Sequence, residues 1–521
     1  MQQTITDKGL TDKKIYFSLF YLILFSTLIR GFLAAYLELG NDEVYYWTYA
    51  LYPDLSHFDH PPMVGYMIQA FTLNLIFDHE FFLRLPSILL GAVNTWLIFL
   101  IGKRMKDGIT GFYAAVLYTA SVYCFIIAGI FILPDTPQLL FWLLSIYFLI
   151  TSVTRTIIIT PVKSNLILAG LTIGLAMLSK YTSVFLWIGA FAYIILYNRR
   201  WLKQKELYVS VLVSVIIFLP VLIWNIQNDF ISFTYQSERV NLFDSGIRLD
   251  YFFRELGGQI LYNNPVNWVL IVIALLALAR GTKVLSKACT RFLLWVSLPL
   301  IFIFLAFSLF RGTLPHWTGP AYLGLMLIAA AYFRKRLSAR PRLMPLQLQL
   351  PLYFLAIILI LGVGQVKFGL LYQPQSDDPT RLGKDDVSLD MYGWRQLSKK
   401  FTPIYREDIL NREMGPKPII LSYRWFPAAN LDYYVACPNR TKVFAIGSLD
   451  RIHKYWWINE IRGGFKKGMD AYFITSSRDY HDPYELYNEY FETIIPRDTI
   501  HIYRSGEVVK NVFIYQMKSM K

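Results

Sequence analysis

Apolar residues fall in long runs separated by short charged loops over residues 15–366, whereas residues 370–521 mix apolar and polar positions more evenly. A helix needs roughly 20 mainly apolar residues to cross a bilayer, and about eleven runs approach that length. The pattern therefore predicts a polytopic α-helical membrane protein with about eleven transmembrane helices. We expect the spans at residues 15–36, 81–102, 109–130, 135–154, 165–180, 181–198, 207–225, 266–280, 292–310, 318–333 and 348–368.

Two apolar runs need separate interpretation. The run 15–36 follows three lysines and exceeds the roughly 7–15-residue apolar core of a secretory signal, so we interpret it as a retained first span. The shorter run 61–77 is bracketed by prolines and Asp78, which favours a helix lying at the membrane interface.

The boundary between the two patterns predicts two domains. Residues 1–368 form the transmembrane domain, with outer loops 37–80, 226–265 and 311–318, and residues 369–521 form a small soluble α/β domain. The simplest interpretation of the second domain is a lid or a docking module. Its predicted strands are 418–422, 442–446 and 471–475, and a capped helix is expected at 482–490.

Charge predicts the orientation. With the N-terminus inside, the segments on that side hold 21 Lys and Arg and four acidic residues, and the whole chain has a net charge of +15. Such an excess is typical of cytoplasmic loops. The net charge therefore indicates membrane topology and not nucleic-acid binding, and an odd number of spans puts 369–521 outside. Cys124, Cys289 and Cys437 fall in three different environments, so we expect no internal disulfide.

The first outer loop carries two acidic clusters. Asp42 and Glu43 lie beside Tyr45, and Asp59 lies beside His60. A solvated loop with interfacial aromatic residues is one interpretation. The other is chemical: a carboxylate at the membrane surface can act as a general base toward a hydroxyl, and Asp59 with His60 could hold a divalent metal ion.

Two further charged residues interrupt apolar runs. Asp135 lies between Pro134 and Pro137 at the start of a span, where it could cap the helix or belong to a site. Lys180 lies between two spans on the outer side, against the charge trend. It could extend to the interface or bind a phosphate.

The other outer loops add possible substrate ligands: a cation for phosphate, an amide, a second cation, an imidazole and an aromatic face. Because all these segments are predicted on one side of the membrane, we expect Asp42, Asp135 and Lys180 to open onto a shared cavity. These further candidates are Arg239, Gln259, Arg311, His316 and Trp317.

Five motifs in this order resemble the GT-C polyprenyl-phosphate-dependent glycosyltransferases, in particular bacterial relatives of the lipid A aminoarabinose transferase within the protein O-mannosyltransferase superfamily. The resemblance covers roughly residues 15–330. The motifs are Asn41-Asp42-Glu43-Val44-Tyr45-Tyr46-Trp47, Phe58-Asp59-His60-Pro61-Pro62, Leu133-Pro134-Asp135-Thr136-Pro137, Leu178-Ser179-Lys180-Tyr181-Thr182 and His316-Trp317-Thr318-Gly319-Pro320-Ala321-Tyr322.

The resemblance implies an inverting sugar transfer from a polyprenyl-phosphate donor to a glycolipid, such as lipid A, or a protein, on the periplasmic face of a bacterial inner membrane. It implies that Asp42 is the first-loop catalytic aspartate, that Asp135 is a second catalytic acid and that Lys180 lies near the carrier phosphate. This chain has Asp59-His60-Pro61-Pro62 where the aminoarabinose transferases have Glu-Lys-Pro-Pro, so the sugar and the acceptor stay open.

Two other functions fit parts of the pattern. A transporter or flippase of lipid-linked sugars would share an apolar groove and cations, but it should keep ionisable residues near mid-bilayer and often shows inverted repeats. A receptor or scaffold would leave the acidic first loop unexplained.

Overall fold

The computed structural model describes residues 12–238, 246–338 and 342–521, which divide into two compact units. The membrane unit comprises the chain up to Ala34 together with Asp54–Ile357. The C-terminal unit comprises Ala35–Pro53 and Ile358–Lys521. The first outer loop is thus divided between them: its first part, with Asp42, belongs to the C-terminal unit.

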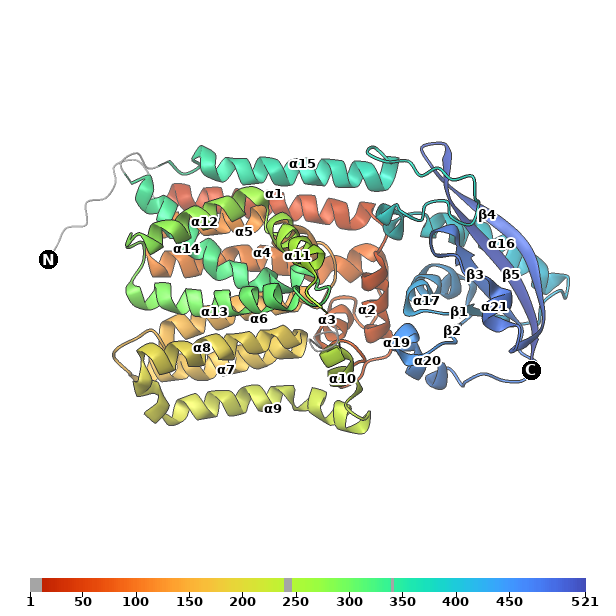
Figure 1. Cartoon of the computed structure of the whole chain (residues 1–521), viewed down its shortest axis with the longest axis horizontal. Coiled ribbons are helices and arrows are strands. Elements are labelled where there is room, and N and C mark those ends of the chain that lie inside the picture. The colour runs from red at the N-terminus through yellow and green to blue at the C-terminus, as the bar shows by residue number, and fades with distance from the viewer. Residues whose placement is uncertain (1–11, 239–245, 339–341) are drawn as a thin grey trace. The chain divides into compact units, whose positions relative to one another are not determined.

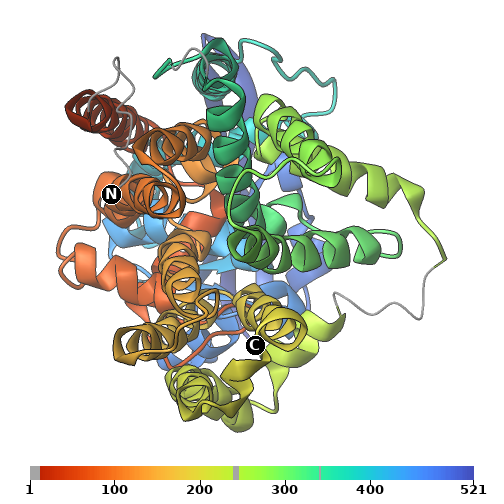
Figure 2. The same cartoon turned by 90° about the vertical axis from the view of Figure 1, so that its left-hand side faces the viewer.

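The membrane unit is a bundle of helices. Its long helices are seen side-on in Figure 1 and end-on in Figure 2, so they run side by side. In chain order the elements are α1 (Asp12–Tyr36, whose last two residues belong to the C-terminal unit), α3 (Met63–Phe71), α4 (Glu80–Met105), α5 (Gly108–Ala120), η1 (Tyr123–Ile127), α6 (Asp135–Ser152), α7 (Thr160–Ser179), η2 (Tyr181–Val184), α8 (Phe185–Tyr197), η3 (Arg199–Lys203), α9 (Lys205–Gln227), α10 (Ile231–Glu238), α11 (Leu249–Tyr262), α12 (Pro265–Ala279), α13 (Lys287–Phe307), η4 (Pro315–Ala321), α14 (Tyr322–Arg336) and α15 (Leu346–Phe368, which ends in the C-terminal unit).

A helix lies at every predicted span, but fewer helices could cross a membrane alone. Among the described residues, six are long and apolar enough, and the α11–α12 pair, bent by 98°, could make a seventh. The count of eleven is therefore not confirmed. Helices α5 and α8 are shorter because each stops or starts at an irregular turn, η1 or η2. The multi-pass membrane architecture itself is confirmed.

Small residues let neighbouring helices approach closely. A Cβ on Gly111 of α5 would lie 2.4 Å from the Phe99 carbonyl oxygen of α4, and one on Gly102 would lie 2.8 Å from the Gly111 Cα. Such small-residue contacts are typical of membrane helix pairs, where the lipid provides no hydrophobic drive for association.

The C-terminal unit contains a five-stranded mixed sheet, as the prediction of a small α/β domain requires. The strand order is β2-β1-β3-β5-β4, with β1 parallel to β2 and β3 and with β5 antiparallel to β3 and β4. The elements are α2 (Asn41–Leu51), η5 (Val387–Met391), α16 (Trp394–Leu410), β1 (Ile419–Ser422), α17 (Trp425–Leu431), η6 (Asp432–Ala436), α18 (Cys437–Asn439), β2 (Val443–Ala445), α19 (Leu449–Ile452), α20 (Tyr455–Ile461), β3 (Ala471–Ser476), η7 (Ser477–Asp479), α21 (Pro483–Tyr487), β4 (Phe491–Arg504) and β5 (Glu507–Met520).

The three predicted strands are present as β1, β2 and β3, and Asp482 caps the predicted helix by accepting from the Tyr484 N–H at 2.9 Å. The long hairpin of β4 and β5 was not predicted. Its turn residues Ser505 and Gly506 have φ of 52° and 89°, as tight hairpin turns require.

Candidate functional site

A buried ion pair is the centre of the site in the membrane unit. The Lys180 ammonium donates to both carboxylate oxygens of Asp135, at 2.9 and 2.8 Å, and the two residues are 4% and 2% exposed. Asp135 is the first residue of α6, and Lys180 is the extended residue at which α7 ends. The carboxylate does not cap its helix, and Lys180 does not reach out to solvent; each neutralises the other.

Tyr123 completes this centre, and the sequence had not singled it out. Its hydroxyl donates to Asp135 Oδ1 at 2.7 Å. Tyr123 opens η1, a π-helical turn inside the predicted span 109–130. A tyrosine in an apolar run carries no distinguishing sequence signal, although π-turns occur frequently at functional sites.

The start of α6 is also tied to η2. The Gln138 amide donates to the hydroxyls of Thr182 and Ser183, both at 2.9 Å. These bonds join the start of α6 to η2, which follows Lys180. They therefore help to fix the geometry of the Asp135–Lys180 pair.

Element η4 brings His316 to the same centre. A Cβ on Gly319 would lie 2.3 Å from the Tyr123 ring, so only glycine permits this contact. Desolvation lowers the pKa of His316 to about 4, and the Lys180 ammonium lowers it further while Asp135 opposes this effect. The imidazole is therefore neutral at physiological pH. His60 also interacts electrostatically with it.

The segment around Asp59 is held by α10. Ser232 donates to the His57 carbonyl at 2.9 Å, and Gln236 donates to the Asp59 carbonyl at 2.7 Å. Within the described residues, no three His, Cys, Asp or Glu side chains are grouped to hold a metal ion. The metal site at Asp59 and His60 stays a prediction.

Gln259 belongs to a buried polar network. Its amide nitrogen donates to Glu255 at 2.8 Å, and its amide oxygen accepts from the Tyr322 hydroxyl at 2.8 Å. Thr313 donates to the other Glu255 oxygen at 2.7 Å. Gln259 thus links α11 to α14, while Glu255 fastens the last outer loop to α11 through Thr313.

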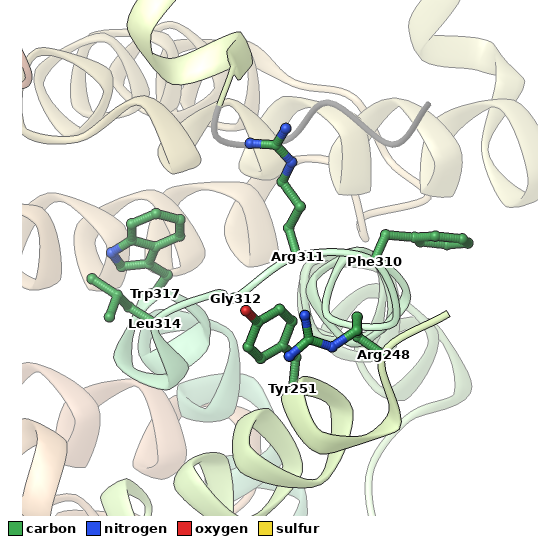
Figure 3. A pocket seen from close by; sticks show the side chains of 7 residues that line it. All are labelled: Arg248, Tyr251, Phe310, Arg311, Gly312, Leu314 and Trp317. Carbon is green, nitrogen blue, oxygen red and sulfur yellow. The ribbon is translucent and has the colours of Figure 1, made fainter. Parts of the chain in front are cut away.

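Arg311 and Trp317 line a cavity of about 460 Å³. Figure 3 shows the Tyr251 ring beside the Arg248 guanidinium, which lies 4.2 Å from the ring centroid. Cations and aromatic rings around one cavity suit an anionic or sugar-bearing group. The other lining residues are Phe310, Gly312 and Leu314.

Asp42, Glu43 and Tyr45 lie on α2 in the C-terminal unit. Asp42 is exposed, whereas Glu43 is buried and accepts from the Gly40 N–H at 2.9 Å, which caps the start of α2. The Tyr45 ring packs 4.8 Å from that of Trp425. The roles of these three residues, and the cavity expected to join Asp42 with Asp135, stay predictions. Arg239 lies outside the described residues.

The chain is similar to known glycosyltransferases. A family model described as dolichyl-phosphate-mannose-protein mannosyltransferase matches residues 59–224, which include Asp59, Asp135 and Lys180. The lipid A galacturonosyltransferase RgtD of Rhizobium johnstonii is 23% identical over 291 residues. That alignment covers 55% of this chain and 59% of the relative, so the chain spans less than two thirds of that protein.

Solved structures share the fold over nearly the whole chain. ArnT from Cupriavidus metallidurans in the apo state has a TM-score of 0.59 at 13% identity, covering 96% of this chain and 98% of ArnT. ArnT bound to undecaprenyl phosphate has a TM-score of 0.65 at 13% identity, covering 97% and 98%. The family model, the relative and the shared fold all indicate the GT-C glycosyltransferase superfamily, in agreement with the resemblance of the five motifs.

Proposed function

We propose that this chain is a membrane glycosyltransferase that moves a sugar from a polyprenyl-phosphate donor to a lipid acceptor, such as lipid A, or to a protein. The observation that carries the proposal is the buried centre of Asp135, Lys180 and Tyr123, all of which lie in the matched segment 59–224. Intramembrane charges are expensive and mark function by default. The relative acts on lipid A, and one structural neighbour holds undecaprenyl phosphate.

In the proposed reaction, an acceptor oxygen forms a bond to the anomeric carbon while the bond from that carbon to the phosphate oxygen breaks. The electron pair leaves with the polyprenyl phosphate, and the configuration inverts. If the acceptor is a hydroxyl, its proton passes to the Asp42 carboxylate. An acceptor phosphate is already ionised, and Asp42 would then position it.

Lys180 has the role of stabilising the leaving phosphate. Its ammonium has three N–H donors, and Asp135 holds the nitrogen at 2.8 to 2.9 Å. A pre-oriented cation aimed at developing negative charge stabilises a transition state without reorganisation. Asp135 and Tyr123 thus orient Lys180 in this proposal. The cavity lined by Arg248 and Arg311 offers further cations for an anionic substrate group.

A divalent metal ion at Asp59 and His60 is a separate part of the proposal. These two side chains provide one carboxylate and one imidazole, so phosphate or water oxygens would have to complete the coordination. When bound, the ion would supply positive charge for a phosphate. None of the steps above depends on it.

We also propose the orientation that the charges predict: a bacterial inner-membrane protein with a cytoplasmic N-terminus and a periplasmic C-terminal unit. The support is the segregation of 21 Lys and Arg against four acidic residues on one side.

The direct test uses purified protein in lipid, a polyprenyl-phosphate donor with a radiolabelled sugar, and an envelope glycolipid or protein extract as acceptor. A transferase releases the free carrier only when acceptor is present, whereas a flippase moves the intact donor across a vesicle membrane. Asp42→Asn should abolish transfer while membrane insertion stays normal. Wild-type turnover by this variant would refute the role of Asp42.

A further inference from the structure

The C-terminal unit includes one short segment of the first outer loop and contacts it at three places. This segment, residues 38–52, contains α2 and the exposed Asp42. We propose that the C-terminal unit is the scaffold that orients Asp42, with Asn430 and Lys454 as positioning residues at the two ends of α2. This inference rests on the proposed function, because it assigns a role toward the catalytic group named there.

The first set of contacts is at the start of α2. The Asn430 amide, fully buried, donates to Asn41 Oδ1 at 2.7 Å, directly beside Asp42. The Leu39 N–H donates to the Tyr434 hydroxyl at 2.7 Å, and the Trp394 N–H donates to Glu38 Oε2 at 2.8 Å. The backbone entering α2 is therefore held from α16, α17 and η6.

The second set of contacts is an aromatic stack on the middle of α2. This helix lies beside α17 (Figure 1). The Tyr45 ring lies 4.8 Å from Trp425 and 5.9 Å from His453, centroid to centroid. Trp425 and His453 are themselves stacked at 5.5 Å. Large rings in contact resist rotation of the helix about its axis.

The third set of contacts is at the end of α2. Lys454, 4% exposed, donates to the carbonyl of Thr48 at 3.1 Å and to that of Tyr52. A cation beside the last carbonyls of a helix complements the helix dipole. Arg462 donates to the Tyr52 hydroxyl at 2.9 Å and also pairs with the buried Asp432 at 2.7 Å.

These three sets of contacts determine where the Asp42 side chain points. Successive residues of an α-helix are about 100° apart around its axis, so a small rotation of α2 would carry the carboxylate away from its direction. The Glu43 carboxylate, which accepts from the Gly40 N–H, fixes the first turn itself. A lid or docking module would not need contacts that converge on the catalytic helix, whereas a scaffold does.

The experiment compares Asn430→Ala, Asn41→Ala, the double variant and Lys454→Met in the full chain. We expect kcat to fall at least tenfold in Asn430→Ala and Lys454→Met, while KM for the donor changes less than threefold. The double variant should be no slower than the slower single variant, because both changes remove the same contact. Hydrogen exchange of residues 38–52 should accelerate in each.

Asn439→Ala is the matched control. Its amide donates to Thr402 and the Val435 carbonyl at 3.1 and 2.8 Å, in the same unit but away from α2. It should keep wild-type kcat and α2 exchange. An equal loss in Asn439→Ala would overturn the inference, because the effect would then be general to the unit.

Asp42→Asn in the same assay separates the two failures. If that variant turns over like wild type, the proposed role of Asp42 is wrong. If it is inactive while Asn430→Ala and Lys454→Met retain wild-type kcat and α2 exchange, the scaffold inference is wrong and the proposed function stands.

Discussion

At the scale of single residues, Asp135 and Lys180 show how a membrane protein can keep charges inside. Each charge would be costly if buried alone, and the pair reduces that cost only while both partners are present. The Tyr123 hydroxyl adds a bond to the carboxylate. Stability and the proposed chemistry therefore depend on the same atoms.

Replacing one residue of the Asp135–Lys180 pair should destabilise the protein more than replacing both. We expect Lys180→Met to destabilise the protein by about 3 kcal/mol, since it strands a buried carboxylate, and Asp135→Asn/Lys180→Met to cost clearly less. Both proteins should lack transfer activity. Thermal unfolding in detergent and the donor assay measure the two effects; equal stability of Lys180→Met and wild type would contradict the buried pair.

His316 should make the protein sensitive to acid. Its folded pKa of about 4 lies below the ordinary value of 6.5, so the unfolded chain binds the proton first as pH falls. The neutral form is favoured by folding: no stability is lost above 6.5, and stability falls as pH drops from 6.5 to 4, by at most about 3 kcal/mol.

His316→Gln should remove this part of the pH dependence. The measurement is the thermal midpoint of both proteins at pH 7.5 and pH 5. Parallel losses in wild type and His316→Gln would show that another group is responsible.

At the scale of elements, the site is built where regular helices stop. Tyr123 comes from the π-turn η1, Lys180 from the break between α7 and η2, and His316 from η4. Asp135 opens α6. Irregular turns let side chains from separate helices converge at one end of a bundle, which uninterrupted helices would not allow.

Gly319 tests the packing of η4 on η1. Gly319→Ala would put a methyl group 2.3 Å from the rigid Tyr123 ring, so Tyr123 should shift from Asp135 and transfer should fall at least tenfold. Gly257→Ala in α11 is the control, because a Cβ there meets nothing within 4 Å. It should keep full activity, with a helix stabilised by up to about 1 kcal/mol. Wild-type transfer by Gly319→Ala would contradict the close contact.

At the scale of the whole molecule, the domains do not follow the order of the chain. Ala35–Pro53 is separated by more than 300 residues from Ile358, yet both belong to the C-terminal unit. The segment that carries Asp42 thus folds with a domain that the sequence alone presents as an appendage. A domain of this kind can control a reaction through the loop it holds.

The natural cysteines can test the proposed orientation. Cys437 is exposed in the C-terminal unit, and Cys289 is half-buried in the first turn of α13. A membrane-impermeant maleimide should label Cys437 in cells with a permeabilised outer membrane, and Cys289 only in inverted vesicles. Cys437→Ser identifies the signal. Labelling of Cys437 only from the cytoplasmic side would reverse the proposed topology.

The sequence by itself determined the helical membrane architecture, the charge asymmetry, three strands of the sheet and the candidate acids and cations. Hydropathy, charge and turn residues are local properties that a linear chain displays directly. Only the tertiary structure decided that Asp135 pairs with Lys180, 45 residues away, that Tyr123 joins them and that α2 folds with the C-terminal unit. These outcomes depend on which distant segments pack together, and packing is a property of the folded chain and not of any one segment.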